Sequence, residues 1–371
     1  MVPNLRFSYK GDWSKRKLNE ICQFFKGNGL SKSDLSNEGF PCILYGELYT
    51  TYKNEVISDI ISKTNTTLAN PFLSRNNDLI IPGSGEDPID IAVARAIYQN
   101  DIILGGDLNI LRPKSNVSAA FLSYQLNGVR RYDIAKKAQG KSIVHLHNSD
   151  LKEVLVSIPT YDEQLHIVEL LTKIDEMIDA QIKIIDSYFS LSKAISNTLI
   201  GQSKGNTRLR ECLNCYSSNT MESVIKQEDL GDYPVYGANG IIKKINNYEI
   251  EYPSIAIVKD GSGVGKMFKL SGKYSILSTL NYLTSKPGYD IDYIYYALKQ
   301  KSLKKYVVGS GIPHIYFKDY EQEKIYIPQN ELQQQNITSV LQSIDEEIGN
   351  EIKQLKNYEL LKKYLLKNMF V

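Results

Sequence analysis

This chain of 371 residues has few of the side chains that build cross-links, metal centres or acid–base sites: four cysteines, four histidines and one tryptophan. Four cysteines in so long a chain do not form a disulfide framework, so we expect a reducing compartment. Cys212 and Cys215 form one isolated Cys-x-x-Cys pair, whereas structural zinc needs four ligands. In the internal repeat described below they align with Ile21 and Phe24, which predicts core residues and no metal.

Long apolar runs and a strong charge of one sign are also missing. No stretch approaches the roughly 18 apolar residues of a membrane span, and residues 1–4 lack the charged-then-apolar layout of a signal peptide. We therefore expect a cytoplasmic protein with no membrane partner. The formal net charge is only +2, with 42% hydrophobic and 23% charged residues, as in ordinary globular proteins.

The usual catalytic motifs are incomplete. The glycine-rich segment 260–267 has Asp260 where a phosphate-binding loop needs glycine, and Met267 where it needs serine or threonine. No Pro-Pro completes a methyltransferase loop at residues 70–72, and no Pro-Asp precedes residues 150–152 at the spacing of a nuclease. The histidines, His166 among them, form no nucleophile–base set. We predict a turn at 260–267 and a non-catalytic chain.

The clearest positive signal is a helix of about forty residues that occurs twice. The first copy runs from Thr160 to Ile200, and the second follows Ile327-Pro328. Apolar residues recur every three or four positions, as on one face of a helix. This spacing predicts a packed seam formed by Ile167, Leu171, Ile174, Ile178, Ile182 and Ile185, and in the second copy by Ile337, Leu341, Ile344, Ile348, Ile352 and Leu355. A shift of 170 residues superimposes the two copies.

Both helices begin with the same signal. Thr160 and Glu163 form a capping-box pattern, and Asn330 and Gln333 repeat it. A helix of forty residues is roughly 60 Å long, which is more than a compact domain of this size needs. Each apolar stripe requires a partner, and the other copy is the obvious one. We therefore predict that the two helices pack antiparallel as a coiled coil.

The segments before the two helices repeat as well. Leu18 corresponds to Leu209 by a shift of 191 residues, Tyr124 to Tyr296 by 172, and His145 to His314 by 169. Preserved order with a drifting offset indicates an old duplication with changed loops. We predict an α+β fold with a pseudo-two-fold internal repeat, in which two mixed α/β domains alternate with two long helices. The predicted boundaries are 1–157 and 206–326 for the globular domains, and 158–205 and 327–371 for the helices.

The globular segments are mildly basic and contain most of the 26 tyrosines, which suits binding better than catalysis. Basic, glycine-containing loops precede His145 and His314 at equivalent places. The candidate nucleic-acid contacts are Arg75, Arg95, Lys136, Lys137, Lys141 and His145 in the first half, and Tyr236, Lys243, Lys244, Lys259, Lys266, Lys304, Lys305, Ser310 and His314 in the second. A solvated lysine-rich surface over a tyrosine-rich core is the alternative explanation for any one of them.

The layout resembles the DNA specificity subunit of type I restriction–modification systems. The resemblance covers essentially the whole chain and is carried by Ile158-Pro159 with its Ile-rich helix, the Ile327-Pro328 copy, and the segments 233–240 and 309–315. It implies two target-recognition domains, each reading half of a split site in double-stranded DNA, and antiparallel helices that measure the unread spacer. The first domain departs from the pattern, with Phe40-Pro41-Cys42-Ile43-Leu44-Tyr45-Gly46 where the second has Tyr-Pro-Val-Tyr-Gly, so individual contacts transfer to it less directly.

The resemblance also implies the partners. Two modification subunits would dock on the helices and bring S-adenosylmethionine for adenine-N6 methylation, and restriction subunits, where the system has them, would use ATP with magnesium. No cofactor is expected in this chain, and the setting would be a bacterial or archaeal cytoplasm. The alternative function is a non-catalytic coiled-coil scaffold whose globular domains bind proteins. Binding to mixed DNA duplexes at two salt concentrations would distinguish the two.

Overall fold

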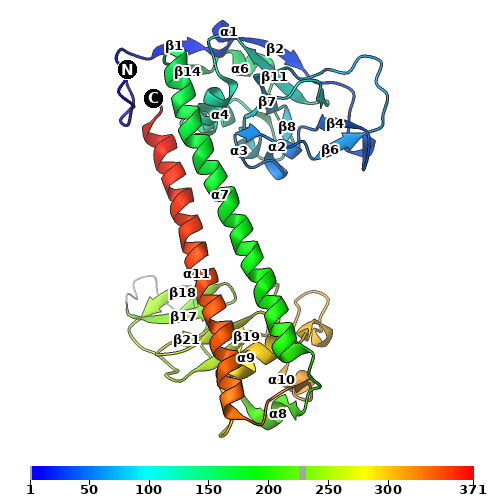
Figure 1. The fold of residues 1–371 in the computed structure, drawn as a ribbon, viewed down its shortest axis with the longest axis vertical. Helices are drawn as coiled ribbons and strands as arrows, with labels where there is room; N and C mark the ends of the chain where they lie inside the picture. Colours follow the sequence, from blue (N-terminus) through cyan, green and yellow to red (C-terminus); the bar gives the residue numbers. More distant parts are fainter. Residues whose placement is uncertain (1, 225–230) are drawn as a thin grey trace. The chain divides into compact units, whose positions relative to one another are not determined.

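The computed structural model describes residues 2–224 and 231–371 (Figure 1). The chain forms two compact units. Unit 1 contains Met1–Lys183 and Lys353–Val371, and unit 2 contains Ile184–Ile352. Each unit holds a globular part of mixed strands and short helices together with one end of both long helices, which confirms the predicted α+β class. No helix of the described residues has the length and hydropathy of a membrane span.

The central sheet of unit 1 is sandwiched between a helix and a smaller sheet. Its strand order is β2 (Cys22–Lys26), β11 (Leu108–Pro113), β7 (Asp78–Pro82), β9 (Arg95–Ile97) and β5 (Val56–Ile57). Because side chains alternate along a strand, Leu79, Ile81 and Leu111 pack with α4 (Ala119–Asn127) on one face. Ile80 and Ile110 pack on the other face. The five-stranded sheet therefore has a helix on one face and the smaller sheet on the other.

The remaining elements of unit 1 are short. The smaller sheet has the order β10 (Ile103–Leu104), β4 (Phe40–Ile43), β6 (Ser62–Thr64) and β3 (Leu35–Ser36), and a separate pair joins β1 (Ser14–Lys17) to β14 (Leu155–Ile158). The short helices are α1 (Leu18–Ile21), α2 (Glu47–Thr50), α3 (Pro88–Ile91), α5 (Arg131–Ala135) and α6 (Asn148–Lys152).

Unit 2 repeats this topology. Its central sheet has the order β16 (Leu213–Ser217), β22 (Leu280–Ser285), β19 (Ser254–Val258) and β20 (Met267–Leu270), and α9 (Ile291–Lys299) takes the place of α4. The smaller sheet is β18 (Gly240–Ile245), β17 (Tyr233–Gly237) and β21 (Ser275–Ile276), with β21 parallel to β17 as β10 is to β4. A pair of β15 (Thr207–Arg208) and β23 (Lys324–Ile325), with α8 (Leu209–Cys212) and α10 (Phe317–Tyr320), completes the unit. The predicted duplication is thus present in the strand order.

The two long helices are α7 (Tyr161–Ser196), which continues as a π-helical turn over Asn197–Gly201, and α11 (Glu331–Asn368). In unit 1 the start of α7 packs against the end of α11, since Ile167, Leu171 and Ile174 share one core with Leu365 and Met369. In unit 2 the end of α7 meets the start of α11, where Ile200 shares a core with Ile337 and Leu341. The chain directions are therefore antiparallel, as predicted.

The seam differs from the predicted one at one position in each helix. Ile182 and Ile352 are 42% and 47% exposed, whereas their neighbours Gln181 and Glu351 are buried and half-buried. Counting Gln181 in place of Ile182 gives steps of four and three that sum to seven, the period of a coiled coil. In the second helix Glu351 likewise takes the place of Ile352, 170 residues later. A polar side chain therefore occupies the seam at equivalent places in the two copies.

The predicted capping box is present in part. Asn330 Oδ1 accepts a hydrogen bond from Leu332 N at the start of α11. At the start of α7, Glu163 instead accepts from Arg6 Nε at 2.6 Å and from Trp13 Nε1 at 3.2 Å. The carboxylate is completely buried and points away from its own helix end, because a cation and an indole from the N-terminal segment compete for it.

In each unit a tyrosine joins the globular part to a long helix. Tyr124 of α4 donates to Asp175 Oδ2 of α7 at 2.7 Å, and Tyr296 of α9 donates to Asp345 Oδ2 of α11 at 3.0 Å. Both pairs obey the internal repeat. Burial and the adjacent carboxylate raise the pKa of each tyrosine, so both phenols remain donors throughout the ordinary pH range.

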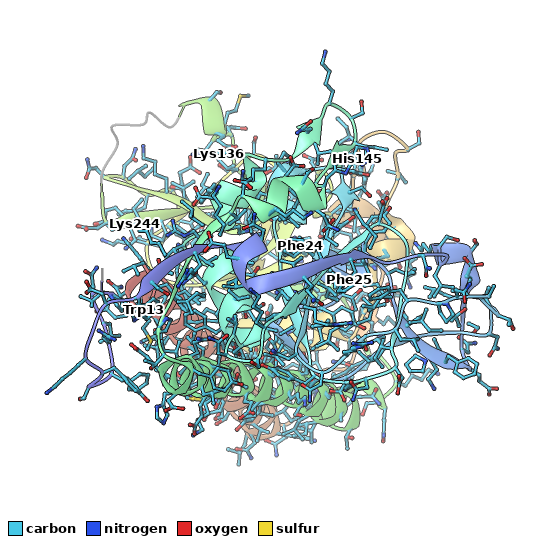
Figure 2. All side chains as sticks on the ribbon, turned by 90° about the horizontal axis from the view of Figure 1, so that it is seen from above. Trp13, Phe24, Phe25, Lys136, His145 and Lys244 are labelled. Atoms are coloured by element: carbon cyan, nitrogen blue, oxygen red, sulfur yellow. The ribbon has the colours of Figure 1, made fainter. Side chains whose placement is uncertain are left out.

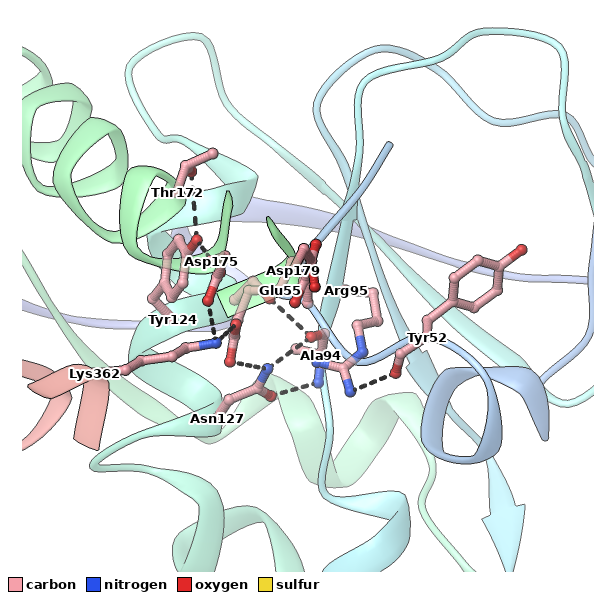
Figure 3. A network of polar contacts seen from close by, with 12 residues as sticks. Tyr52, Glu55, Ala94, Arg95, Tyr124, Asn127, Thr172, Asp175, Asp179 and Lys362 are labelled. Carbon is pink, nitrogen blue, oxygen red and sulfur yellow. Dashed lines mark hydrogen bonds and ion pairs between the residues drawn. The ribbon is translucent and has the colours of Figure 1, made fainter. Parts of the chain in front are cut away.

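In unit 1 the Tyr124–Asp175 pair is next to further buried charged side chains (Figure 3). Lys362 of α11 lies 2.6 Å from both Asp175 and Glu55, and the exposed fractions of these three side chains are between 6% and 16%. Burial acts to lower the pKa of Lys362, but the two carboxylates outweigh it and the pKa is raised. Unit 2 has no equivalent lysine, since Ser192 occupies that place. Lys299 lies 4.0 Å from Asp345, and both side chains are about a third or more exposed.

We predict that Lys362→Met destabilises the protein by about 3–5 kcal/mol, because it leaves two buried carboxylates without a cation. Lys299→Met is the matched control and should cost less than about 1 kcal/mol, as expected for an exposed pair. Chemical denaturation followed by circular dichroism measures both. Equal losses for the two variants would show that the charges of unit 1 are not stabilised by Lys362.

Candidate nucleic-acid interface

The loop that precedes His145 folds as a small hairpin at the end of the central sheet of unit 1. Strands β12 (Gln139–Gly140) and β13 (Val144–His145) pair with each other, and β13 also pairs with β8 (Ser84–Gly85). Since β8 follows β7 directly, the hairpin is attached where that central strand ends. Leu146 N donates to Gly83 O at 2.9 Å and closes the attachment.

Unit 2 contains the same hairpin. His314 forms a bridge with Val308, as His145 does with Gln139, and a second bridge with Asp260 after β19. Ile315 N donates to Lys259 O at 2.9 Å, matching the Leu146 contact. His314 Nδ1 additionally donates to Asp260 Oδ1 at 2.7 Å. The segment 260–267 is the tight turn predicted from the sequence, and Val264 N donates to Gly261 O within it.

An aromatic pair follows each hairpin. The rings of His145 and His147 are stacked, with centroids 6.1 Å apart and planes 1° from parallel. His314 and Tyr316, at the equivalent positions, are stacked at 6.4 Å and 14°. Flat ring faces and imidazole nitrogens can contact bases and phosphates, so the repeat of this pair favours a shared binding role.

Four candidates of unit 1 lie together on this hairpin. Lys136 and Lys137 follow α5 and lead into β12, Lys141 lies in the turn, and His145 ends β13. All except the half-buried Lys137 are exposed. In Figure 2 the side chains of Lys136 and His145 lie on the side of unit 1 away from α7. The cations therefore form one basic edge around the histidine.

The two arginine candidates of unit 1 lie elsewhere. Arg75 is exposed, but it precedes β7 and so lies at the opposite end of that strand from the hairpin. Arg95 is the first residue of β9, but only 6% of it is exposed. Its guanidinium donates to Leu48 O at 3.2 Å and Tyr52 O at 3.0 Å. This corrects the prediction for Arg95, which binds backbone carbonyls within the core and offers no surface to a nucleic acid.

In unit 2 most candidates gather around the second hairpin. Ser310 lies in its exposed turn, the exposed Lys304 precedes it, and the half-buried Lys259 follows β19. Lys266 Nζ donates to Asn239 Oδ1 at 3.2 Å, which brings the β17–β18 turn next to the glycine turn. Three loops thus converge on one basic surface.

Four candidates of unit 2 take other roles or lie further along the strands. Lys305 is paired with Glu323 at 2.7 Å, and the hydrogen bond between them raises the pKa of Lys305. Tyr236 packs its ring edge against the buried Tyr274 at 6.0 Å, which indicates a core contact. Lys243 and Lys244 lie on β18, half-buried and exposed respectively.

Sequence reasoning missed two residues that shape the first hairpin. Lys26, at the end of β2, brings its ammonium group next to Gly83. Burial lowers the pKa of Lys26. Asn109 is fully buried and donates through Nδ2 to Pro82 O at 3.2 Å and Leu146 O at 2.8 Å, so it fastens the hairpin to the sheet. The sequence signal that could have identified Asn109 is its recurrence in the second repeat as Asn281.

The described part of the two units contains no cluster of metal ligands. No three histidine, cysteine or acidic side chains converge on a metal site within residues 2–224 and 231–371. Cys212 is fully buried, and burial raises the pKa of Cys212 to about 12 and that of the half-buried Cys215 to about 11. Cys212 lies in the core of unit 2 and Cys215 packs against it, which confirms the prediction of core residues.

Comparison with known proteins supports a nucleic-acid role. A family model described as the type I restriction modification DNA specificity domain matches residues 10–186 and again residues 207–357. The two matches cover the two repeats and most of the chain.

Individual relatives agree. The type I restriction enzyme MjaVIII specificity subunit of Methanocaldococcus jannaschii is 34% identical over 169 residues, which are 42% of this chain and 39% of that protein. The putative type I specificity subunit S.MgeORF438P of Mycoplasma genitalium is 23% identical over 402 residues, covering 100% of this chain and 97% of that one.

Solved structures share the fold. The S subunit of a type I restriction–modification system from M. genitalium superimposes with a TM-score of 0.70 at 19% identity, over 100% of this chain and 99% of that one. A chain from a structure of type I complex assembly and conformational transition gives a TM-score of 0.52 at 13% identity, with 97% and 98% covered.

We predict that Lys136→Ala and Lys304→Ala each reduce the salt dependence of binding to duplex DNA. Every lost phosphate contact should lower the slope of log K against log [salt] by about 0.9. The double variant should lose about twice as much. Lys173→Ala, on the exposed face of α7 and paired with Glu169, is the control and should leave the slope unchanged. Fluorescence anisotropy across a salt series measures the slope, and an unchanged slope in the double variant would remove these lysines from the interface.

Proposed function

Because this chain belongs to the family of type I restriction–modification DNA specificity subunits, we propose that its two units each read one half of a split DNA site. The chain itself is the non-catalytic specificity subunit of the system. The observation that carries the proposal is the repeated hairpin, which presents a histidine, a second ring and a group of lysines at the same end of the central sheet in both units.

The chemistry of the hairpins fits DNA. Lysines contribute phosphate contacts that position the protein, and histidine, serine and asparagine side chains can read base edges. A two-stranded ribbon is also narrow enough to enter the major groove. Two DNA-binding units of moderate affinity on one chain bind more tightly together than either does alone when the two half-sites are correctly spaced. Residues 1–157 and 206–326 are the proposed target-recognition domains.

The long helices are the proposed docking site of two modification subunits. Met177, Ile184 and Leu191 are exposed on α7 at steps of seven residues, in line with the half-buried Leu170. A stripe of this period suits a second helix. S-adenosylmethionine would be bound by the modification subunits, and ATP with magnesium by restriction subunits. The complex would act on DNA in a bacterial or archaeal cytoplasm. The scaffold alternative is set aside because the family model matches both repeats.

The test is a map of N6-methyladenine in cells that express the modification partner with and without this chain. We expect one split motif to be methylated only when the chain is present. Met177→Glu, which puts a charge into the α7 stripe, should abolish methylation of both halves while purified protein still binds the motif. An unchanged map on deletion would contradict the assignment, and loss of DNA binding by Met177→Glu would contradict the division of roles.

The spacer can be tested separately. Insertion of seven residues after Lys183 in α7 and after the equivalent Lys353 in α11 preserves the heptad register and lengthens each helix by about 10 Å. We expect both half-sites to be retained and the spacer between them to grow by two or three base pairs, at roughly 3.4 Å per step. Methylation mapping reads out the motif. A changed half-site would show that the helices do more than set distance, and insertion into one helix alone serves as the unbalanced control.

A further inference from the structure

Each hairpin ends in an extended segment whose side chains alternate between core and solvent. In residues 143–147 of unit 1, Val144 and Leu146 are buried, whereas Ile143, His145 and His147 are exposed. In residues 312–316 of unit 2, Ile315 is buried and Pro313 half-buried, and Ile312 and Tyr316 are exposed on either side of His314. The outward order is therefore isoleucine, histidine, ring in both units.

The isoleucines are the unexpected members of this stripe. Ile143 is 58% exposed and Ile312 is 62% exposed, at positions related by the same shift of 169 residues as the two histidines. The core of each unit gains little from these side chains, which lie in the turn of the hairpin. Their recurrence at one place in both repeats indicates that an apolar group is needed there for contact with something outside the chain.

The turn that presents each isoleucine begins with a glycine that a larger residue could not replace without strain. Gly140 has φ 135° and Gly309 has φ 94°, which other residues adopt only with strain. A Cβ on Gly140 would lie 2.0 Å from Ile143 O, and one on Gly309 would lie 2.5 Å from Ile312 O. The buried neighbours and the backbone bonds to Gly83 and Lys259 fix the other end of each segment. The segment that carries each isoleucine is therefore attached to the end of the central sheet three residues further along the chain.

We propose that Ile143 and Ile312 each contact the C5-methyl group of a thymine in the major groove of their half-site. This rests on the proposed reading of DNA by the two hairpins. Lys141 lies two residues before Ile143, and the turn that contains Lys266 is bonded to the second hairpin from Gly261 N to Pro313 O at 2.9 Å. Such cations favour a polyanion. The thymine methyl is the one apolar group that a base pair presents in the major groove, and apolar side chains read it there.

Thymine is available in both halves. A half-site methylated on adenine pairs that adenine with thymine, so the duplex carries at least one C5-methyl group in each half. The adjacent His145 or His314 would contact a neighbouring base edge or phosphate from the same side of the segment. In unit 2 the Asp260 contact holds the imidazole in one orientation, so the apolar and polar contacts keep a fixed spacing.

The experiment replaces each thymine of the two half-sites, one at a time, by deoxyuridine. This removes the C5-methyl group and leaves base pairing and hydrogen-bonding groups unchanged. For the wild-type chain we expect one position in each half-site at which affinity falls about fourfold, the effect of one buried methyl. For Ile143→Ala the fall at the first position should vanish while the second remains, and for Ile312→Ala the reverse should hold.

Ile61→Ala provides the matched control, because Ile61 is 62% exposed and lies outside both hairpins. It should keep the wild-type response at both positions, and thermal unfolding should show all three variants to be folded. If no deoxyuridine weakens wild-type binding, or if the Ala variants keep the full response, the inference is wrong although the function stands. If the wild-type chain does not distinguish its motif from a scrambled duplex, the proposed function itself fails.

Discussion

The hydrogen bond from a tyrosine of the globular part to an aspartate of a long helix is the contact on which each unit depends. Tyr124 and Tyr296 belong to α4 and α9, which cover one face of a central sheet. The hairpin with the candidate contact residues is attached to the end of that same sheet. The path from helix to hairpin therefore runs through one phenol, one short helix and one strand. In unit 1 the aspartate of this path is also paired with the buried Lys362 at 2.6 Å, whereas in unit 2 Lys299 lies 4.0 Å from Asp345.

The architecture could be predicted from the sequence because the pattern of a globular segment followed by a long helix occurs twice in the chain. Apolar spacing located both long helices, and the shifts of single residues such as Leu18 and Tyr124 located the duplicated sheets. The predicted seam differs from the observed one by one residue. The apolar pattern favours Ile182, whereas the buried residue is its neighbour Gln181. Hydrophobicity alone does not separate a period of 3.5 from one of 3.6 over a few turns, whereas packing against a second helix does.

The interface was predictable only in outline. The sequence indicates lysines next to glycine-containing turns, and the equivalence of His145 and His314 predicts that the two turns occupy the same place in the two repeats. Arg95 was misread because the carbonyls of Leu48 and Tyr52, which hold its guanidinium, lie more than forty residues away in sequence. Glu163 failed as a cap for the same reason, since Arg6 comes from a distant segment. Composition indicates which side chains are charged, but tertiary contacts decide which of them face solvent.

The use of α11 in both units has a consequence for biosynthesis. Unit 1 places Leu365, Met369 and Phe370 in the same core as Trp13 and Phe121, and draws Lys362 into its charge network. Its sheet and hairpin emerge from the ribosome early, but its core is incomplete until the residues after 361 have followed. Unit 2, which spans Ile184–Ile352, has all of its residues before that point. Of the two units, the one whose sheets are translated earlier is therefore the later one to complete its core.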